Sequence, residues 1–160
     1  MAFSRDMVLW TGLGVIVLAA IVAGLAVTGG PAEARRLKED QQRETALLST
    51  ANALVCLQKA GMEIPETAEQ LEVVWKEYRS TAQDKCFNGD LRVDPVTDAP
   101  FALVREEGRV TQICAEFAAP RKQEDGPFQY RSTNALPNLG DRREAAGTHC
   151  FAINYSAEVG

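Results

Sequence analysis

The chain has 160 residues, of which 46% are hydrophobic, and this apolar content is too high for a wholly disordered protein. Lys and Arg number 17 against 22 Asp and Glu, and the formal net charge of −5 argues against a uniformly basic nucleic-acid-binding protein. Residues 7–28 are uncharged and mostly apolar, which leaves about 130 residues for one modest domain.

Residues 7–28 predict a transmembrane signal-anchor helix. In helical conformation they cover about 33 Å, which is enough for a hydrocarbon layer about 30 Å thick. Trp10 fits the membrane interface, and residues 1–6 then form a short cytoplasmic N-terminus. Small residues four apart predict a groove for packing against another helix, with ordinary small-residue content as the alternative. These helix-packing candidates are Ala19, Ala20, Ala23 and Gly24.

A cleaved signal peptide is the alternative to an anchor, because Ala32-Glu33-Ala34 has the small-x-small pattern of a cleavage site. The apolar run is longer than the roughly 7–15 residues usual in secretory signals, and this favours an uncleaved anchor. Positive charge after the segment, at Arg35, Arg36, Lys38 and Arg43, favours a cytoplasmic C-terminal part. Long tails cross the membrane largely regardless of charge, so the cysteines carry more weight for orientation.

The four cysteines, Cys56, Cys86, Cys114 and Cys150, form an even set without a CxxC pattern. In a small exported domain such a set indicates two disulfides, with three possible connectivities. We favour Cys56–Cys86, which ties a helix end to the loop after the next helix, and Cys114–Cys150, which joins two strand-like runs. Oxidised cysteines place the C-terminal domain in the periplasm of a single-pass protein of the bacterial inner membrane. Free thiols in a cytosolic tail are the alternative.

Residues 29–60 predict a break followed by one long helix. Its first part is polar on nearly every face, with Leu37 the only large apolar residue, so residues 29–46 are expected to form a solvated stalk. From residue 47 onward, apolar residues recur at helical spacing and predict a face that packs on a core. Gly61 is expected to end the helix in the left-handed conformation. The domain is therefore expected to comprise residues 47–160.

A second, shorter helix is expected from its N-cap, Thr67, to about Thr81. The following stretch is dense in turn-forming residues, and its aspartates do not match the spacing of a calcium-binding loop. Residues 101–105 and 109–117 then predict an antiparallel hairpin, with Gly108 at positive φ. The packed side of the short helix is expected to hold Leu71, Val74, Trp75 and Tyr78.

Residues 118–147 show no periodicity and contain several Pro and Gly, so they predict a long loop that is either mobile or held by a partner. The elements together predict an α+β fold. It consists of an N-terminal transmembrane helix, a long stalk and packing helix, a second short helix, and a small antiparallel sheet held by disulfides. If a partner holds the loop, its contact residues are Phe128, Tyr130, Leu136 and Leu139.

The order of these elements resembles that of type IV pilin-like proteins, especially the major pseudopilin of type II secretion. The similar stretch is Asp94-Pro95-Val96-Thr97-Asp98-Ala99-Pro100-Phe101 with the hairpin that follows it. The chain is also similar to a group of uncharacterised single-span bacterial membrane proteins with a late cysteine pair, here Cys114 and Cys150. The resemblance covers about residues 34–155 and implies a pilin-like periplasmic domain. No prepilin-peptidase site precedes the apolar helix, which counts against filament assembly.

The sequence carries no catalytic motif that predicts an enzyme. Its single His, His149, would have to serve any Ser/His/Asp site, and neither a P-loop nor a dinucleotide fingerprint is present. We therefore expect no catalysis, cofactor or metal. The favoured function is a non-catalytic accessory subunit that binds a larger inner-membrane protein complex through its transmembrane helix and periplasmic domain, with the lipid bilayer as a second partner and no nucleic acid. The alternatives are a divergent pseudopilin of a secretion system and a periplasmic ligand-binding or sensory module.

Overall fold

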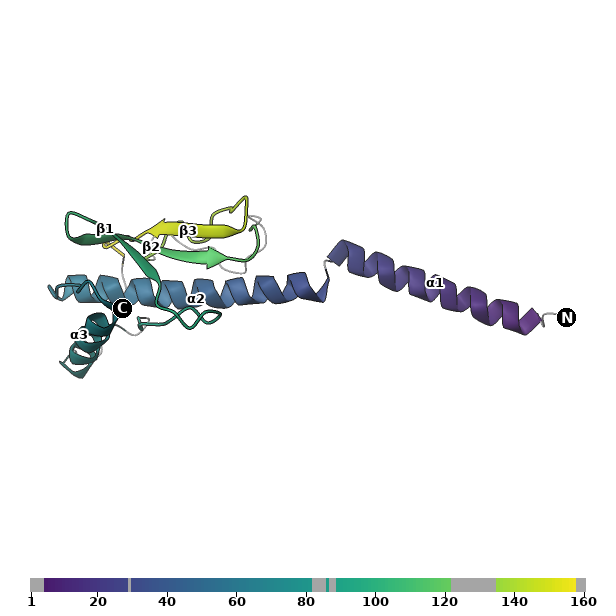
Figure 1. Ribbon diagram of the computed structural model, residues 1–160, viewed down its shortest axis with the longest axis horizontal. Coiled ribbons are helices and arrows are strands. Elements are labelled where there is room, and N and C mark those ends of the chain that lie inside the picture. Colours follow the sequence, from purple (N-terminus) through teal and green to yellow (C-terminus); the bar gives the residue numbers. More distant parts are fainter. Residues whose placement is uncertain (1–4, 29, 82–85, 87–88, 122–134, 158–160) are drawn as a thin grey trace. The chain divides into compact units, whose positions relative to one another are not determined.

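The fold is α+β, with helices in the first half of the chain and an antiparallel sheet in the second (Figure 1). The computed structural model describes residues 5–28, 30–81, 86, 89–121 and 135–157, and within the first helix it describes the side chains of residues 10, 12–21, 23 and 24. The described elements are α1 (Arg5–Thr28), α2 (Pro31–Lys59), α3 (Ala68–Thr81), β1 (Ala102–Glu106), β2 (Arg109–Phe117) and β3 (Gly147–Ala152).

The chain divides into two compact units, Met1–Arg36 and Leu37–Gly160. In the part of the chain that the structure describes, no helix is both long and apolar enough to cross a membrane, so the predicted transmembrane helix stays a prediction. The first unit contains α1, whose described large apolar side chains are between 51% and 74% exposed. These side chains are Trp10, Leu13, Val15, Ile16, Val17, Leu18 and Ile21.

Helix α2 supplies the central element of the second unit and packs on two sides. Pro31 begins this helix. Proline is tolerated at this position, because the N–H group that it lacks would have no partner within the first turn. Gly61 follows its last turn with a φ of +72°, and the N–H of Met62 donates to the carbonyl of Leu57 at 3.0 Å. This is a glycine C-cap, and the predicted helix end is confirmed.

The sheet covers one side of α2, and Figure 1 shows it lying along the helix. Its strand order is β1-β2-β3, and both pairings are antiparallel. Glu107 and Gly108 both have positive φ, 51° and 78°, as a two-residue hairpin turn requires, which confirms the hairpin and the prediction for Gly108. The main cluster joins α2 to the inner face of the sheet through Leu47, Ala51, Val55, Ile113, Phe117 and Phe151.

Helix α3 covers other residues of α2 and forms the second apolar cluster. Thr67 caps it, because its hydroxyl accepts a hydrogen bond from the N–H of Gln70 at 3.3 Å. The predicted helix and its packed side are confirmed: Leu71, Trp75 and Tyr78 are buried, and Val74 packs against them. On α2 the cluster uses Ala53, Leu54, Cys56 and Leu57.

All four cysteines are in disulfides, and both predicted pairs are confirmed. Cys56 of α2 is bonded to Cys86, with the two Cα atoms 6.3 Å apart. Cys114 of β2 and Cys150 of β3 are directly opposite in the strand register, with their Cα atoms 4.0 Å apart. Each disulfide restricts the unfolded chain by closing a loop, and this adds about 3–4 kcal/mol to the free energy of unfolding.

Two sequence predictions need correction. The second unit begins at Leu37, not at residue 47, and α2 is already buried at Asp40, Arg43 and Glu44. The predicted solvated stalk is therefore wrong for these residues, because their polar groups meet opposite charges and backbone amides of their own unit instead of water. The structure also gives β3 as Gly147–Ala152, so the strand begins at the last residue of the predicted loop 118–147.

Candidate binding cleft

A cleft of about 920 Å³ lies in the second unit, between α3 on one side and β1 with the segment before it on the other. The first wall comes from residues 65–69 and the side of α3 that carries Leu71, Glu72 and Trp75. The second wall comes from residues 90–93 and from residues 100–103 with Arg105. No described residue of the first unit lines it.

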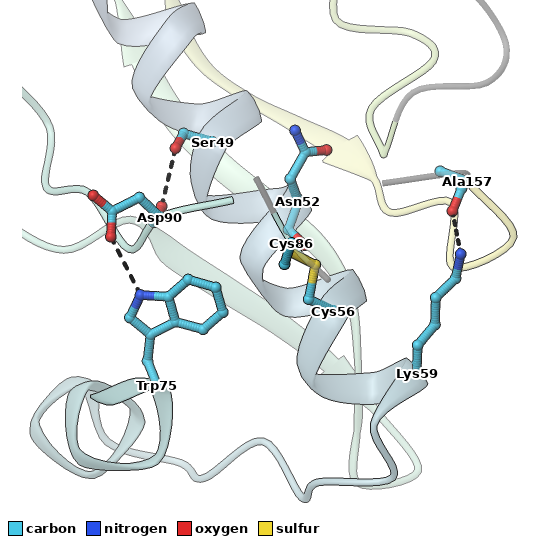
Figure 2. The surroundings of a disulfide bond; sticks show 8 residues. All are labelled: Ser49, Asn52, Cys56, Lys59, Trp75, Cys86, Asp90 and Ala157. Carbon is cyan, nitrogen blue, oxygen red and sulfur yellow. Dashed lines mark hydrogen bonds between the residues drawn. A yellow bond between two sulfur atoms is a disulfide. The ribbon is translucent and has the colours of Figure 1, made fainter. Parts of the chain in front are cut away.

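Two sets of polar contacts join the walls of the cleft. Near the start of α3, the guanidinium of Arg105 donates to the carbonyl of Ile64 at 3.1 Å and to that of Pro65. In the second half of α3, the carboxylate of Asp90 accepts from the indole N–H of Trp75 at 3.2 Å (Figure 2). Arg79 lies 3.5 Å from the same oxygen. Between these contacts the two walls are separate, and the space there is the cleft.

The wall at residues 90–93 is fixed to α2. The N–H of Asp90 donates to the carbonyl of Ser49 at 3.1 Å, while the hydroxyl of Ser49 donates to the carbonyl of Asp90 at 3.2 Å, as Figure 2 shows. The hydroxyl of Thr50 accepts from the N–H of Arg92 at 3.0 Å. The Cys56–Cys86 disulfide attaches the chain just before this segment to the same helix. Both backbone polar groups of Asp90, its N–H and its carbonyl, are therefore bonded to α2, and these bonds hold the wall in place.

The lining combines apolar side chains with charges on the rim. Leu71, Trp75 and Phe101 are buried members of the wall, so the interior of the cleft is mainly apolar. Glu69 on the α3 wall and Arg92 on the opposite wall are exposed and form no ion pair with another described residue. Glu69 thus presents a negative charge on the α3 wall, and Arg92 presents a positive charge on the opposite wall.

The cleft reaches the start of β1 and the residues just before it. In a strand, successive side chains point to opposite faces of the sheet, so a cavity against one face would contact alternate residues only. The lining contains Phe101, Leu103 and Arg105, which alternate along the chain, and also Pro100 and Ala102. Just before β1, Pro100 forms an isolated antiparallel bridge with Val93, so the segment at residues 90–93 lies beside this end of the strand.

A buried charge cluster is the largest feature that the sequence did not reveal. Arg43 of α2 donates through Nη1 to Asp40 at 2.9 Å and through Nε to Asp94 at 2.8 Å. The carboxylate of Asp40 also accepts from the backbone N–H groups of Ala118 and Ala119, at 2.9 and 3.0 Å. Through these contacts Asp40 and Arg43 attach α2 to Asp94 and to the residues that follow β2.

The second half of this cluster is centred on Glu44. Its carboxylate is paired with Arg143 at 2.8 Å and with Arg121, and the backbones of the two arginines bond to each other. The guanidinium of Arg143 lies over the ring of Phe117, 3.8 Å from its centroid. Since three carboxylates meet three guanidinium groups, the cluster is balanced in charge, and its geometry is that of a structural connection.

The structure places the predicted contact residues differently from the sequence interpretation. Leu136 and Leu139 are fully buried in the main cluster, so the prediction that they contact a partner is wrong. Their side chains are needed by the chain's own core. Phe128 and Tyr130 lie outside the described residues. The predicted helix-packing residues Ala19, Ala20, Ala23 and Gly24 are on α1 and are exposed within the chain.

Four residues of types that can bind metal ions have other contacts. Cys150 is in a disulfide, and the ring of His149 lies 3.0 Å from the carbonyl of Ala145. Asp90 and Asp94 face the indole and guanidinium groups described above. Within the described ranges, no three His, Cys, Asp or Glu side chains are grouped so that they could hold a metal ion.

Sequence reasoning missed the cleft, because nothing in the chain marks its two walls as neighbours. Trp75 was predicted on a packed helix face, which is correct, but its indole partner Asp90 was only one acid in a turn-rich stretch. Comparison with known proteins adds no further residue: no family model, no curated protein and no solved structure matches this chain.

Proposed function

We propose that the protein is a non-catalytic, membrane-anchored accessory subunit of the bacterial inner membrane. In this function α1 is the anchor, the second unit lies in the periplasm, and the chain binds a larger protein complex. The description of residues 1–6, 7–28 and 29–36 as cytoplasmic end, signal anchor and connection to the domain belongs to the same proposal.

The observation that carries the proposal is the exposed apolar surface of α1. Its described large side chains, from Trp10 to Ile21, are more than half exposed, although such side chains favour an apolar environment by about 1.5–3 kcal/mol each. Residues 7–28 contain no charged side chain. A helix of this kind requires lipid or another protein around it, and an accessory subunit of a membrane complex provides both.

The disulfides support the periplasmic location. Both join residues that are far apart in the chain, and no cysteine is left free. Disulfides of this kind form and persist in oxidising compartments and are rare in the cytosol.

Thiol labelling combined with co-purification tests the proposal. Intact cells are treated with a thiol reagent before and after reduction, and the chain is then purified in mild detergent. We expect labelling of the four cysteines only after reduction, together with a companion protein in fixed stoichiometry. Labelling of all four cysteines without reduction contradicts the periplasmic location, and a chain that purifies alone contradicts the accessory role.

A divergent pseudopilin is the second candidate, favoured by the packing of an antiparallel sheet on α2 and by the turn at Asp94. The carboxylate of Asp94 accepts from the N–H of Val96 at 2.9 Å, and its backbone N–H donates to the carbonyl of Ala99 at 2.9 Å. This turn lies within the stretch that resembles the pseudopilins. N-terminal sequencing separates the candidates: a cleaved and methylated start supports the pseudopilin, whereas a start at Met1 or Ala2 contradicts it.

A further inference from the structure

We infer that the Cys114–Cys150 disulfide is a site of thiol–disulfide exchange, at which an external thiolate attacks Sγ of Cys150. The Cys56–Cys86 disulfide, in contrast, is structural. The inference goes beyond the proposed function, because it requires neither the anchor nor a companion protein. The co-reactant is a thiol, either free in solution or carried by another protein.

The Cys114–Cys150 disulfide lies on the face of the sheet that is turned away from α2. Successive side chains of a strand point to opposite faces of the sheet. Ile113 of β2 and Phe151 of β3 pack in the main cluster with α2. Each of them is next to one of the two cysteines, so the disulfide is on the other face.

The two cysteines of this bond differ in their access to solvent. Cys150 is exposed, whereas Cys114 is only 6% exposed. The rate of thiol–disulfide exchange depends on access and on which sulfur is attacked. In the other disulfide, Cys56 is buried and Cys86 is partly buried, with its Sγ close to Gly89. Cys150 therefore gives an external thiolate the best access to a disulfide of this chain.

The backbone pairing of β2 and β3 does not depend on the sulfur–sulfur bond. The N–H of Ile153 donates to the carbonyl of Thr111 at 2.9 Å, so these two opposite residues form a hydrogen-bonded pair. Hydrogen-bonded pairs alternate with pairs that exchange no hydrogen bond, and Cys114 and Cys150 form a pair of the second kind. Reduction therefore breaks no hydrogen bond between the strands.

The exchange has two steps. A thiolate attacks Sγ of Cys150, a mixed disulfide forms there, and the electron pair of the broken bond leaves on Sγ of Cys114, which takes a proton from water. A second thiolate then attacks the donor sulfur of the mixed disulfide, and Cys150 leaves as a thiolate and is protonated. The chain gains two electrons and two protons, and two external thiols become a disulfide.

The same geometry allows the bond to form again. Cys114 and Cys150 are opposite in the register, with their Cα atoms 4.0 Å apart, and the side chains of such a pair are close together. Since the paired strands hold both thiols in place, closing the bond is an intramolecular step. The pair can therefore alternate between dithiol and disulfide while the sheet stays folded.

A redox titration of the full chain, oxidised and in mild detergent, tests the inference. The chain is equilibrated with glutathione and glutathione disulfide, quenched with acid, alkylated and mapped by mass spectrometry. We expect Cys114 and Cys150 to be reduced at a [GSH]²/[GSSG] ratio about tenfold or more below the one that reduces Cys56–Cys86. At intermediate ratios we expect bound glutathione on Cys150 and not on Cys114.

Two single variants test the difference in access. Cys114→Ser leaves the thiol of Cys150, and Cys150→Ser leaves the thiol of Cys114. We expect glutathione disulfide to modify Cys114→Ser about tenfold or more faster than Cys150→Ser. The double variant is the fold control, and its far-UV circular dichroism should match that of the oxidised parent. The position of glutathione on the parent chain is a measurement that needs none of these variants.

A comparison of donors identifies the source of the thiol. Reduced thioredoxin and glutathione are supplied at equal thiol concentration, and the rate of reduction of Cys114–Cys150 is measured for each. A faster reaction with thioredoxin assigns the donor to a protein, and a faster reaction with glutathione assigns it to a small thiol. Either result supports exchange at Cys150.

Three results overturn the inference. They are reduction of Cys56–Cys86 at the same or a lower ratio, a mixed disulfide mainly on Cys114, and loss of the sheet when Cys114–Cys150 is reduced. These failures leave the proposed function in place if a companion co-purifies. A chain that purifies alone defeats the proposed function but leaves the exchange site in place.

Discussion

Gly89 occupies the tightest backbone position among the described glycines. A Cβ at this residue would lie 2.9 Å from the backbone nitrogen of Ala53 and 2.9 Å from Sγ of Cys86. Neither atom is the end of a flexible side chain, since one belongs to α2 and the other to a disulfide. The absence of a side chain at residue 89 is therefore what lets the wall of the cleft approach α2.

Gly89→Ala is expected to lower the free energy of unfolding by about 1–3 kcal/mol, because the added methyl group forces α2 and the wall apart. Denaturant unfolding of the oxidised full chain measures this change. A Gly89→Ala chain as stable as the parent would contradict the close approach.

Tyr155 is the one described group with a resolved change in pKa. Its hydroxyl donates to the carbonyl of Val110 at 2.8 Å. Burial raises the pKa of Tyr155 above its ordinary value of 10.0, and the nearby Arg109 and Arg105 lower it by a smaller amount. The folded state therefore holds this proton more tightly than the unfolded state does. The resulting stability is complete below pH 10 and is lost as the pH rises through the pKa of the folded state.

Tyr155→Phe is expected to cost about 1 kcal/mol at pH 7, because the buried carbonyl of Val110 loses its donor. The difference in stability between the parent and the variant should be constant up to about pH 9 and become smaller above pH 10. Parallel denaturation series from pH 7 to 11 measure it. A difference that grows with pH above 10 would mean that the pKa is lowered instead.

Among the elements, α2 has the most demanding position, because it buries charges at one end and apolar residues at the other. Asp40, Arg43 and Glu44 are each about 5% exposed. Removing one partner from a buried ion pair leaves an uncompensated charge, which costs far more than the pair itself contributes. The attachment of α2 to the rest of its unit therefore requires every charged partner of this cluster to be present.

Glu44→Gln is expected to destabilise the second unit by about 3–5 kcal/mol, because the buried guanidinium of Arg143 then loses the carboxylate with which it is paired. Thermal unfolding of the oxidised chain is the measurement. Glu63→Gln, at an exposed carboxylate of the same unit, is the control and should change stability by less than about 0.5 kcal/mol.

Local signals predicted the elements whose determinants lie close together in the sequence. Thr67 and the spacing of Leu71, Trp75 and Tyr78 are enough to define α3, and Gly108 is enough to define the hairpin turn. The disulfide pairs followed from the order of helices and strands, which those same signals supplied.

The remaining parts depend on residues that are distant in the sequence. Asp40 meets the backbone of Ala118, 78 residues away, and Glu44 meets Arg121, 77 residues away. A polar helix with such partners has the same sequence pattern as a solvated one, so the stalk prediction failed there. The cleft has the same origin, because Trp75 acquires its place in the wall only through Asp90 and the fold of α2 beneath both.

For the whole molecule, the anchor proposal makes a direct prediction about fractionation. Leu13→Lys combined with Leu18→Lys places two charges among the exposed apolar residues of α1. Each charge costs about 2.5–3.5 kcal/mol near the centre of a membrane helix, so the variant should leave the membrane fraction on alkaline carbonate extraction. Leu37→Lys, at an exposed leucine beyond the apolar segment, is the control and should stay with the membranes.

The two disulfides also have a simple order along the chain: the first cysteine is joined to the second, and the third to the fourth. When the part of a chain that follows a signal anchor crosses a membrane in the order of its sequence, Cys86 becomes accessible before Cys114 has crossed. An oxidase that couples each newly arrived thiol to the one already waiting therefore makes both native bonds. For a protein exported as proposed, a thiol oxidant on the far side of the membrane is therefore sufficient to form the native pairs in this order.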